Sequence, residues 1–226
     1  MKEHSEILTE HYQKTYELTF DLWKERNRIF LALITVVGGA TILTFSPSAA
    51  NPLLVLWAAK ALGVTSDAKV QELGRSFPFG LVQTTLLIVV FYLMVNLYHR
   101  AIYILRNYRY LAELEKEIRA ELGSAPQSVA FTREGYFYWT DRRFLQGAVK
   151  WCYILLVGSL LFAFLGGRIY IDFKIGNVIL ALVDLLVSFA TALFFAAYAR
   201  SSVSLDRAKE VHLAEPEMAA KARGAA

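Results

Sequence analysis

Four apolar stretches, each near the length that crosses a bilayer, constrain this chain of 226 residues more than any other feature. They cover residues 29–45, 80–98, 151–167 and 178–198. A helix needs about 20 apolar residues to cross the hydrocarbon core, so each stretch predicts one spanning helix. Hydrophobic residues form 56% of the chain, which leaves too little polar sequence to cover four such helices. The sequence therefore predicts an all-α integral membrane protein with four transmembrane helices.

The positions of the basic residues predict how the chain is oriented. All but five of its 24 Lys and Arg residues lie before the first stretch, between the second and third, or after the fourth. The exceptions are Lys60, Lys69, Arg75, Arg168 and Lys174. Because cytoplasmic segments are enriched in Lys and Arg, both termini and the central segment are expected in the cytoplasm. We expect a multi-pass protein in the lipid bilayer of a plasma membrane, the inner membrane of a bacterium.

Two of the spans are predicted to extend into the cytoplasm as helices. Residues 1–28 have helical apolar periodicity and run directly into the first span. Residues 97–122 contain neither Gly nor Pro and continue the second span as a helix. This helix forms the first part of the predicted cytoplasmic segment 99–150. The extensions run in opposite directions, so they can pack as an antiparallel hairpin or pair between subunits as a coiled coil. We expect both, in a homo-oligomer, with packing through Tyr12, Tyr16, Phe20, Trp23, Tyr108, Leu111 and Ile118.

The segments between and after the spans carry weaker patterns. Within the unit 29–98, residues 52–62 are apolar but too short to span, which predicts an interfacial helix or a re-entrant segment. Residues 129–139 predict a short β-hairpin or loop. Residues 151–200 are expected to pair as a helical hairpin, and the tail 201–226 to be largely disordered after residue 211. Contact with lipid headgroups is expected from Trp139, Arg142, Arg143 and Lys150.

Polar residues inside the spans are the candidate functional residues, because hydrocarbon disfavours them. Asp184 begins one helical face of the fourth span, which continues through Ser188, Thr191 and Tyr198. A second polar face of the second span contains Thr85, Tyr92, Asn96 and His99. The two faces together predict a hydrated path in which Asp184 favours cations. Alternatively, the polar residues are packing contacts and Asp184 meets the interface, Arg168 or Lys174.

Small residues predict where helices approach one another closely. In the first span these are Gly38 and Gly39. One side of the third span carries Cys152, Ser159, Ala163 and Gly166. The pattern does not separate contacts within one chain from contacts between chains.

Neither an enzyme nor a nucleic-acid-binding protein is expected. The chain has four histidines and contains no P-loop, Gly-x-Ser-x-Gly or metalloprotease motif, so no cofactor or metal site is predicted. Basic residues at membrane edges explain the net charge of +4.

The layout of residues 5–122 is a helix, a span, an outer loop, a second span and a long helix. This layout resembles the two-span effector modules of bacterial nucleotide-signalled defence systems, and the resemblance implies oligomeric pores. The leading hypothesis is a homo-oligomeric channel or pore-forming effector whose cytoplasmic helices gate or assemble it. The alternative is a scaffold or accessory subunit whose cytoplasmic hairpin binds a partner, either a protein or a signalling ligand.

Overall fold

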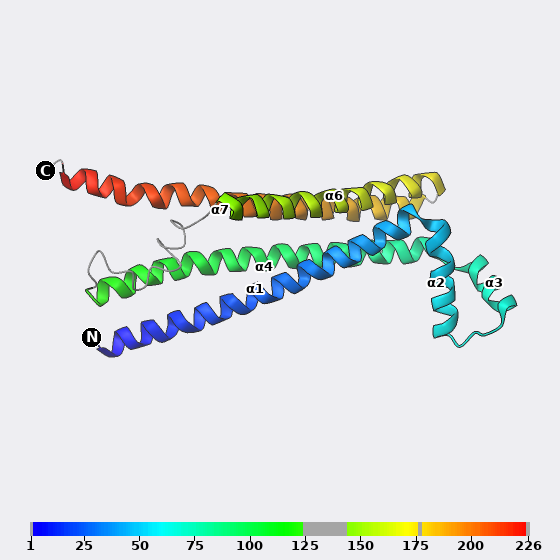
Figure 1. The fold of residues 1–226 in the computed structure, drawn as a ribbon, viewed down its shortest axis with the longest axis horizontal. Coiled ribbons are helices and arrows are strands. Elements are labelled where there is room, and N and C mark those ends of the chain that lie inside the picture. The colour runs from blue at the N-terminus through cyan, green and yellow to red at the C-terminus, as the bar shows by residue number, and fades with distance from the viewer. Residues whose placement is uncertain (1, 124–143, 176–177, 225–226) are drawn as a thin grey trace. The chain divides into compact units, whose positions relative to one another are not determined.

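A computed structural model gives the fold for residues 2–123, 144–175 and 178–224, and describes side chains for residues 4–123, 151–174 and 178–202 (Figure 1). The described part of the chain contains six helices and no strand. In chain order these are α1 (Lys2–Phe45), α2 (Pro47–Ala61), α3 (Asp67–Ser76), α4 (Phe79–Glu121), α6 (Phe144–Ile175) and α7 (Val178–Gly224).

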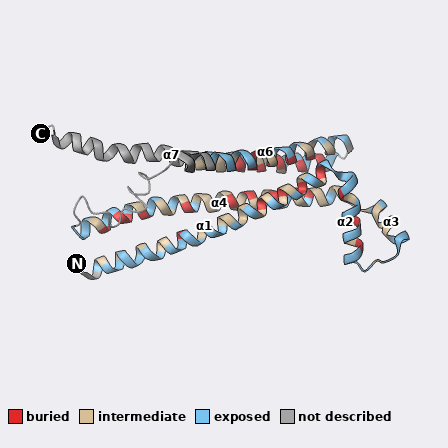
Figure 2. Ribbon diagram, viewed as in Figure 1, coloured by how far each residue is buried: buried red, intermediate tan, exposed pale blue. Residues whose placement is uncertain are grey.

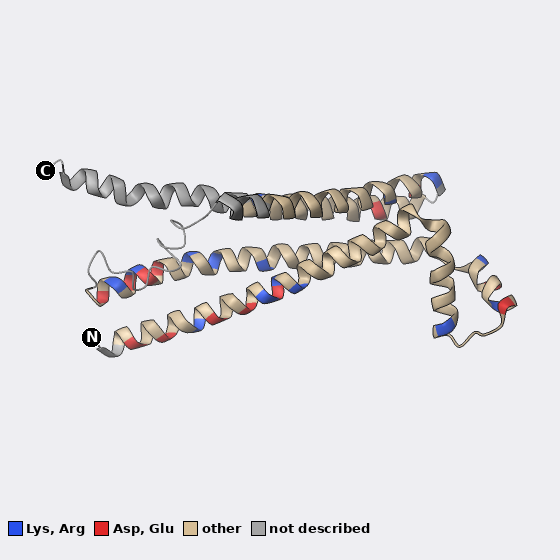
Figure 3. Cartoon of the chain, viewed as in Figure 1, with Lys and Arg blue, Asp and Glu red and all other residues tan. Residues whose placement is uncertain are grey.

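Four of these helices, α1, α4, α6 and α7, are long and apolar enough to cross a membrane. This confirms the predicted helical class and the four apolar spans, while the orientation of the termini stays a prediction. Helix α1 has 44 residues and α4 has 43, so each continues well past its apolar stretch. Their charged residues lie mainly in the first half of α1 and the last part of α4 (Figure 3).

The chain divides into two compact units. Unit 1 contains residues 1–29, 96–153 and 196–226, and unit 2 contains residues 30–95 and 154–195. Unit 2 therefore holds most of the apolar length of the four long helices, together with α2 and α3.

Unit 2 is built on one buried stripe from each long helix, at spacings of three and four residues (Figure 2). The stripes are Leu33, Val37, Ala40 and Thr44 in α1; Thr84, Leu87, Val90 and Met94 in α4; Val157, Leu161, Phe164, Arg168 and Asp172 in α6; and Ala181, Asp184, Ser188, Thr191 and Phe195 in α7. Most of the buried surface is apolar. The polar members gather toward the end of the unit where α1 and α6 end and α4 and α7 begin.

Aromatic rings and Gly158 set close contacts between the helices of unit 2. The rings of Phe91 in α4 and Phe194 in α7 lie 5.9 Å apart, and Phe162 in α6 meets Phe195 in α7 edge-on at 5.8 Å. Gly158 faces Phe195, and a Cβ there would lie 2.9 Å from the ring. Only small residues allow α6 this close to its neighbour.

The small residues that the sequence singles out do not lie at these close contacts. No atom lies within 4 Å of where a Cβ would stand on Gly38, Gly39 or Gly166. Cys152 and Ser159 are exposed. These residues therefore do not form packing faces within one chain, where Gly158 and Gly167 face the bundle instead, and their role in contacts between chains stays a prediction.

The third span is longer than predicted. Helix α6 continues through Arg168 to Ile175, eight residues past the predicted end of the span at residue 167. The apolar stretch ends at Gly167 in the sequence, but Arg168 is buried and neutralised by carboxylates, so the helix does not have to stop there.

Two segments outside the spans also differ in extent from expectation. Helix α2 begins at Pro47, five residues before the predicted apolar segment, and ends at Ala61. Gly63 then takes φ +70°, a conformation that favours glycine, and its N–H donates to the Lys60 carbonyl. Helix α7 continues to Gly224, beyond the residue where disorder was expected, and its Ala, Glu, Met and Lys residues are strong helix formers.

Unit 1 pairs the first part of α1 with the last part of α4. The Tyr12 hydroxyl donates to Glu115 Oε1 at 2.9 Å, and His11 Nε2 lies 2.8 Å from the Tyr110 hydroxyl. Arg100 forms an ion pair with Glu25 at 3.0 Å. The order of these contacts along the two helices is that of an antiparallel pair. Residues 129–139, where the sequence predicts a hairpin or loop, lie outside the described residues, and so do Arg142 and Arg143.

Candidate functional site

The candidate site is a buried charged cluster around Arg168, which we call the Arg168 network: Gly80, Gln83 and Thr84 of α4, Arg168 and Asp172 of α6, and Asp184 of α7. Helix geometry explains how these residues meet. Arg168 and Asp172 are four residues apart, so they lie on the same face of α6. Asp184 lies near the start of α7 and Thr84 near the start of α4, at the same end of unit 2.

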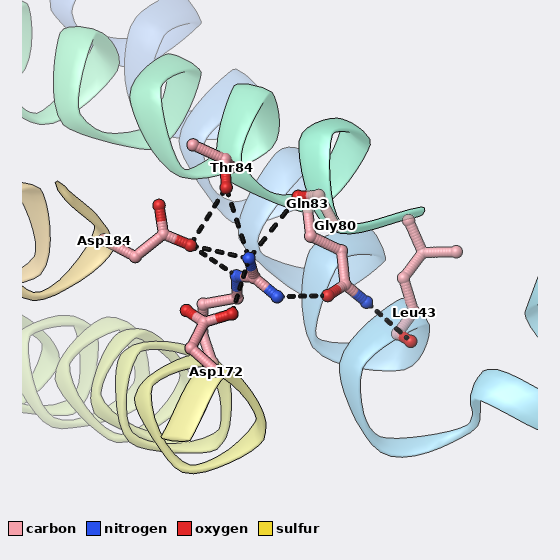
Figure 4. Close-up of polar contacts among 7 residues, drawn as sticks. Leu43, Gly80, Gln83, Thr84, Asp172 and Asp184 are labelled. Carbon is pink, nitrogen blue, oxygen red and sulfur yellow. Dashed lines mark hydrogen bonds and ion pairs between the residues drawn. The ribbon is translucent and has the colours of Figure 1, made fainter. Parts of the chain in front are cut away.

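Arg168 is the centre of the network. Its Nε donates to Asp184 Oδ2 at 2.7 Å, and its Nη1 donates to Gln83 Oε1 at 2.7 Å. Its Nη2 lies 2.7 Å from both Asp172 Oδ1 and Asp184 Oδ2, so both carboxylates approach the same nitrogen (Figure 4). The planar guanidinium thus joins α4, α6 and α7, which a single lysine ammonium would not do with the same geometry.

The uncharged side chains of Thr84 and Gln83 complete the Arg168 network. The Thr84 hydroxyl donates to Asp184 Oδ2 at 3.0 Å and lies 3.2 Å from Arg168 Nη2. Gln83 accepts from Arg168 through Oε1, and its Nε2 lies 3.5 Å from the Leu43 carbonyl near the end of α1 (Figure 4). The network therefore reaches all four long helices of unit 2.

The network is withdrawn from solvent. Arg168 and Asp184 are 0% exposed and Asp172 is 3% exposed. Moving ions out of water carries a penalty of several kcal/mol each, which mutual attraction offsets only when the geometry is good. The short contacts to Arg168 meet that condition. The cluster is consequently a strong constraint on how these helices pack.

The polar seam predicted on the fourth span lies inside unit 2 and contacts the network. Asp184, Ser188 and Thr191 are all buried on one face of α7, and the Thr191 hydroxyl donates to the Val187 carbonyl at 2.7 Å. Tyr198 belongs to unit 1 and is half-buried. Of the alternatives for Asp184, the structure supports the ion pair with Arg168.

The polar face predicted on the second span does not meet that seam. Thr85 and Tyr92 are exposed, and the Thr85 hydroxyl donates to the Leu81 carbonyl of its own helix at 2.8 Å. The residue that contacts Asp184 is Thr84, one position earlier. After Thr84 the buried stripe of α4 continues with apolar residues only, namely Leu87, Val90 and Met94. The two seams therefore do not face each other within one chain, because helical rotation turns Thr85 and Tyr92 away from α7. A hydrated path lined by both seams in an oligomer stays a prediction. Asn96 is half-buried and His99 is exposed, both in unit 1.

The side chains predicted to pack in the extensions of α1 and α4 are divided between buried and exposed positions. Leu111 and Ile118 are fully buried, and Tyr12 bonds Glu115, while Tyr16 and Tyr108 are half-buried. Phe20 and Trp23 stack on each other with centroids 6.2 Å apart, yet both are exposed. Of the residues predicted to contact lipid headgroups, Lys150 lies in α6, where the structure describes its backbone alone. Trp139 lies outside the described residues.

Comparisons with protein-family models, curated proteins and solved structures give no match. Among the described residues, no group of three His, Cys, Asp or Glu side chains is placed to hold a metal ion.

The sequence interpretation missed Gln83, Thr84 and the central role of Arg168. A signal was present: Val157, Leu161, Phe164 and Arg168 follow spacings of four, three and four, so Arg168 continues a core stripe. Asp172 extends the stripe by one more turn. A charged pair in register with an apolar stripe predicts a buried ion pair better than a loop.

Proposed function

We propose that the protein is a homo-oligomeric membrane channel or pore-forming protein whose conducting path lies between copies of the chain. In this proposal the Arg168 network holds the four helices of each copy together and does not line the path. Asp184, tied to Arg168 and buried, is assigned to the fold of the subunit.

The observation that carries the proposal is an exposed stripe on α4, which we call the α4 outer stripe: Leu81, Thr85, Ile88 and Tyr92. Spacings of four, three and four residues are those of a helix-pairing seam. The stripe carries the hydroxyls of Thr85 and Tyr92, and Tyr92 is 64% exposed within an apolar span. Polar residues on such a face favour association with another helix over contact with lipid. A second copy of the chain supplies that helix, and the hydroxyls then border the path between copies.

The test compares two matched pairs of variants in liposomes loaded with a cation-sensitive dye. Thr85→Val and Tyr92→Phe remove hydroxyls from the α4 outer stripe and are expected to reduce flux severalfold. Thr35→Val is the control, because Thr35 is exposed on α1 and donates to its own helix at 2.9 Å, as Thr85 does. Tyr170→Phe is the control for Tyr92, because Tyr170 is equally exposed on α6.

Two results would contradict the proposal. One is a monomeric mass in detergent or lipid nanodiscs combined with no flux from the wild type. The other is an equal change in flux for stripe and control variants.

A second candidate is a scaffold that presents its cytoplasmic hairpin to a partner. It is favoured by the exposed stacked rings of Phe20 and Trp23, which lie beside the charged residues of α1. Exposed aromatic side chains of this kind are typical of binding surfaces. A monomer that conducts nothing, but loses a bound cytoplasmic protein on Trp23→Ala, would favour this function.

A further inference from the structure

The Arg168 network carries more negative than positive charge. Asp172 and Asp184 contribute two carboxylates, and Arg168 contributes one guanidinium, all at most 3% exposed. The other groups that contact it are uncharged: Gly80, Gln83 and Thr84 of α4, with the Leu43 carbonyl of α1 reached through Gln83. Fully ionised, the network would hold one uncompensated negative charge away from water. An unpaired buried charge is normally neutralised.

The hydrogen-bonding capacity of the network is also short by at least one hydrogen. Arg168 Nη2 has two hydrogens but four oxygen neighbours, on Asp172, Asp184, Thr84 and Gly80, at 2.7 to 3.4 Å. Among the residues whose side chains the structure describes, three buried oxygens have no hydrogen-bond partner: Asp172 Oδ2, Asp184 Oδ1 and Ser188 Oγ. Ser188 is 3% exposed and stands one turn along α7 from Asp184. Such unsatisfied buried atoms are rare in folded proteins, and a bound water, an ion or a proton normally accounts for them.

From this arrangement we propose that the Asp172–Asp184 pair is a binding site for one exchangeable proton, held on Asp172 Oδ2 or Asp184 Oδ1 at neutral pH. One proton removes the excess charge and supplies the missing hydrogen in a single step. Two carboxylates that share one proton are a known solution where like charges cannot both ionise.

A proton explains the geometry better than a metal cation. Hard cations such as Ca²⁺ and Mg²⁺ take about six or more oxygen ligands, whereas three oxygens among the described residues here lack partners, one of them a turn away on α7. The guanidinium also occupies the space between the carboxylates, since both contact its Nη2. The bound proton exchanges with water by opening at this end of unit 2, where Asp172 is three residues from the end of α6.

Linkage gives the direction of the pH effect. The folded state in this proposal binds one proton that the exposed Asp side chains of the unfolded state release at neutral pH. Stability must then fall as pH rises through the range in which the folded pair loses its proton. Replacing either Asp by Asn leaves one carboxylate for one guanidinium, so the variant needs no proton and loses this pH dependence.

The experiment measures infrared absorption of the full chain in lipid vesicles, in water and in deuterated water, at neutral pH. The wild type is expected to show the carbonyl band of one protonated carboxylic acid, shifted by deuteration. Asp172→Asn and Asp184→Asn are each expected to abolish that band. Asp67→Asn, which changes an exposed carboxylate in α3, is expected to keep it.

Stability measurements distinguish folding from proton binding. Asp172→Asn is expected to stay folded and to lose the decline in stability that the wild type shows as pH rises. The double variant Asp172→Asn/Asp184→Asn isolates Arg168 and is expected to unfold. A wild type without an acid band at neutral pH would overturn the proposal, whatever the variants do. So would stabilisation by sodium over choline without such a band, since a metal cation would then balance the charge. None of these readouts depends on conduction or on oligomeric state, so they test this site separately from the proposed function.

Discussion

Two Arg–carboxylate pairs in this protein have similar geometry and very different surroundings. In unit 1, Arg100 and Glu25 lie 3.0 Å apart with side chains 38% and 48% exposed. In unit 2, Arg168 and Asp184 lie 2.7 Å apart and neither side chain is exposed. Water and salt screen the first pair, whereas the second interacts in a medium of low dielectric. The loss of stability on breaking such a pair therefore depends little on the distance between the charges and mainly on how deeply they are buried.

The pairs also differ in how many helices they join. Arg100 and Glu25 connect α1 with α4, two helices that are also joined by the Tyr12–Glu115 and His11–Tyr110 contacts. Arg168 links its own helix α6 to α4 and α7 directly, and to α1 through Gln83. Loss of the exposed pair leaves the neighbouring packing intact. Loss of Arg168 removes the shared partner of two buried carboxylates.

The largest effect is therefore expected from Arg168→Met. It leaves Asp172 and Asp184 buried without a cation, which typically costs about 3–5 kcal/mol. We expect a correspondingly lower free energy of unfolding in bicelles, or failure to purify in folded form. Arg75→Met removes an exposed arginine of α3 and serves as the control. Equal stability of the two variants would show that burial does not decide the effect.

A smaller loss is expected where α6 packs against Phe195. In Gly158→Ala the new Cβ would lie 2.9 Å from the ring of Phe195, which is buried against Phe162 and has little room to move. Overpacking of this kind costs roughly 1–3 kcal/mol. Gly166→Ala lies two turns along the same helix with no atom within 4 Å and is expected to be neutral or slightly stabilising. Thermal unfolding of both variants in one detergent checks the difference, and a greater loss for Gly166→Ala would contradict it.

The helices themselves were predictable because hydrocarbon imposes a length and composition on each span. The four apolar stretches and the long extensions of α1 and α4 follow from apolar runs and from the absence of Gly and Pro. The end of α6 was not predictable from apolar runs alone, because the apolar stretch ends at Gly167 while the helix continues through Arg168. Ion pairs with Asp172, one turn along α6, and with Asp184, sixteen residues later, make that arginine acceptable inside the bundle.

Rotation of the helices about their axes was the other feature that sequence could not establish. Thr84 and Thr85 are adjacent and chemically identical, but only Thr84 faces Asp184. The polar periodicity of residues 85, 92, 96 and 99 identified a real face of α4 without indicating whether it points inward. The apolar stripe from Leu87 to Met94 was an equally regular alternative, and burial of apolar volume made it the inner face.

Within unit 1, an intermediate effect is expected from Tyr12→Phe. It removes the hydroxyl that donates to Glu115 Oε1 at 2.9 Å, and Glu115 is buried. Hydrogen bonds to charged groups contribute about 1.5–3 kcal/mol, and we expect the lower end because Glu115 has further interactions. Hydrogen exchange of the α4 amides around Glu115 provides the measurement. Tyr103→Phe, which keeps the exposed ring beside His99, should leave that exchange unchanged.

The smallest effect is expected from Glu25→Gln, which breaks the exposed pair with Arg100. Exposed ion pairs contribute about 0.2–1 kcal/mol, so the free energy of unfolding should change by less than about 1 kcal/mol. Raising the salt from about 0.1 M to 1 M shortens the screening length from about 10 Å to 3 Å, so the difference from wild type should shrink further. Arg168→Met measured in the same two salt concentrations should keep its full effect, because ions do not enter the buried network. If salt reduced both effects equally, the two pairs would share one dielectric environment and the contrast between the units would fail.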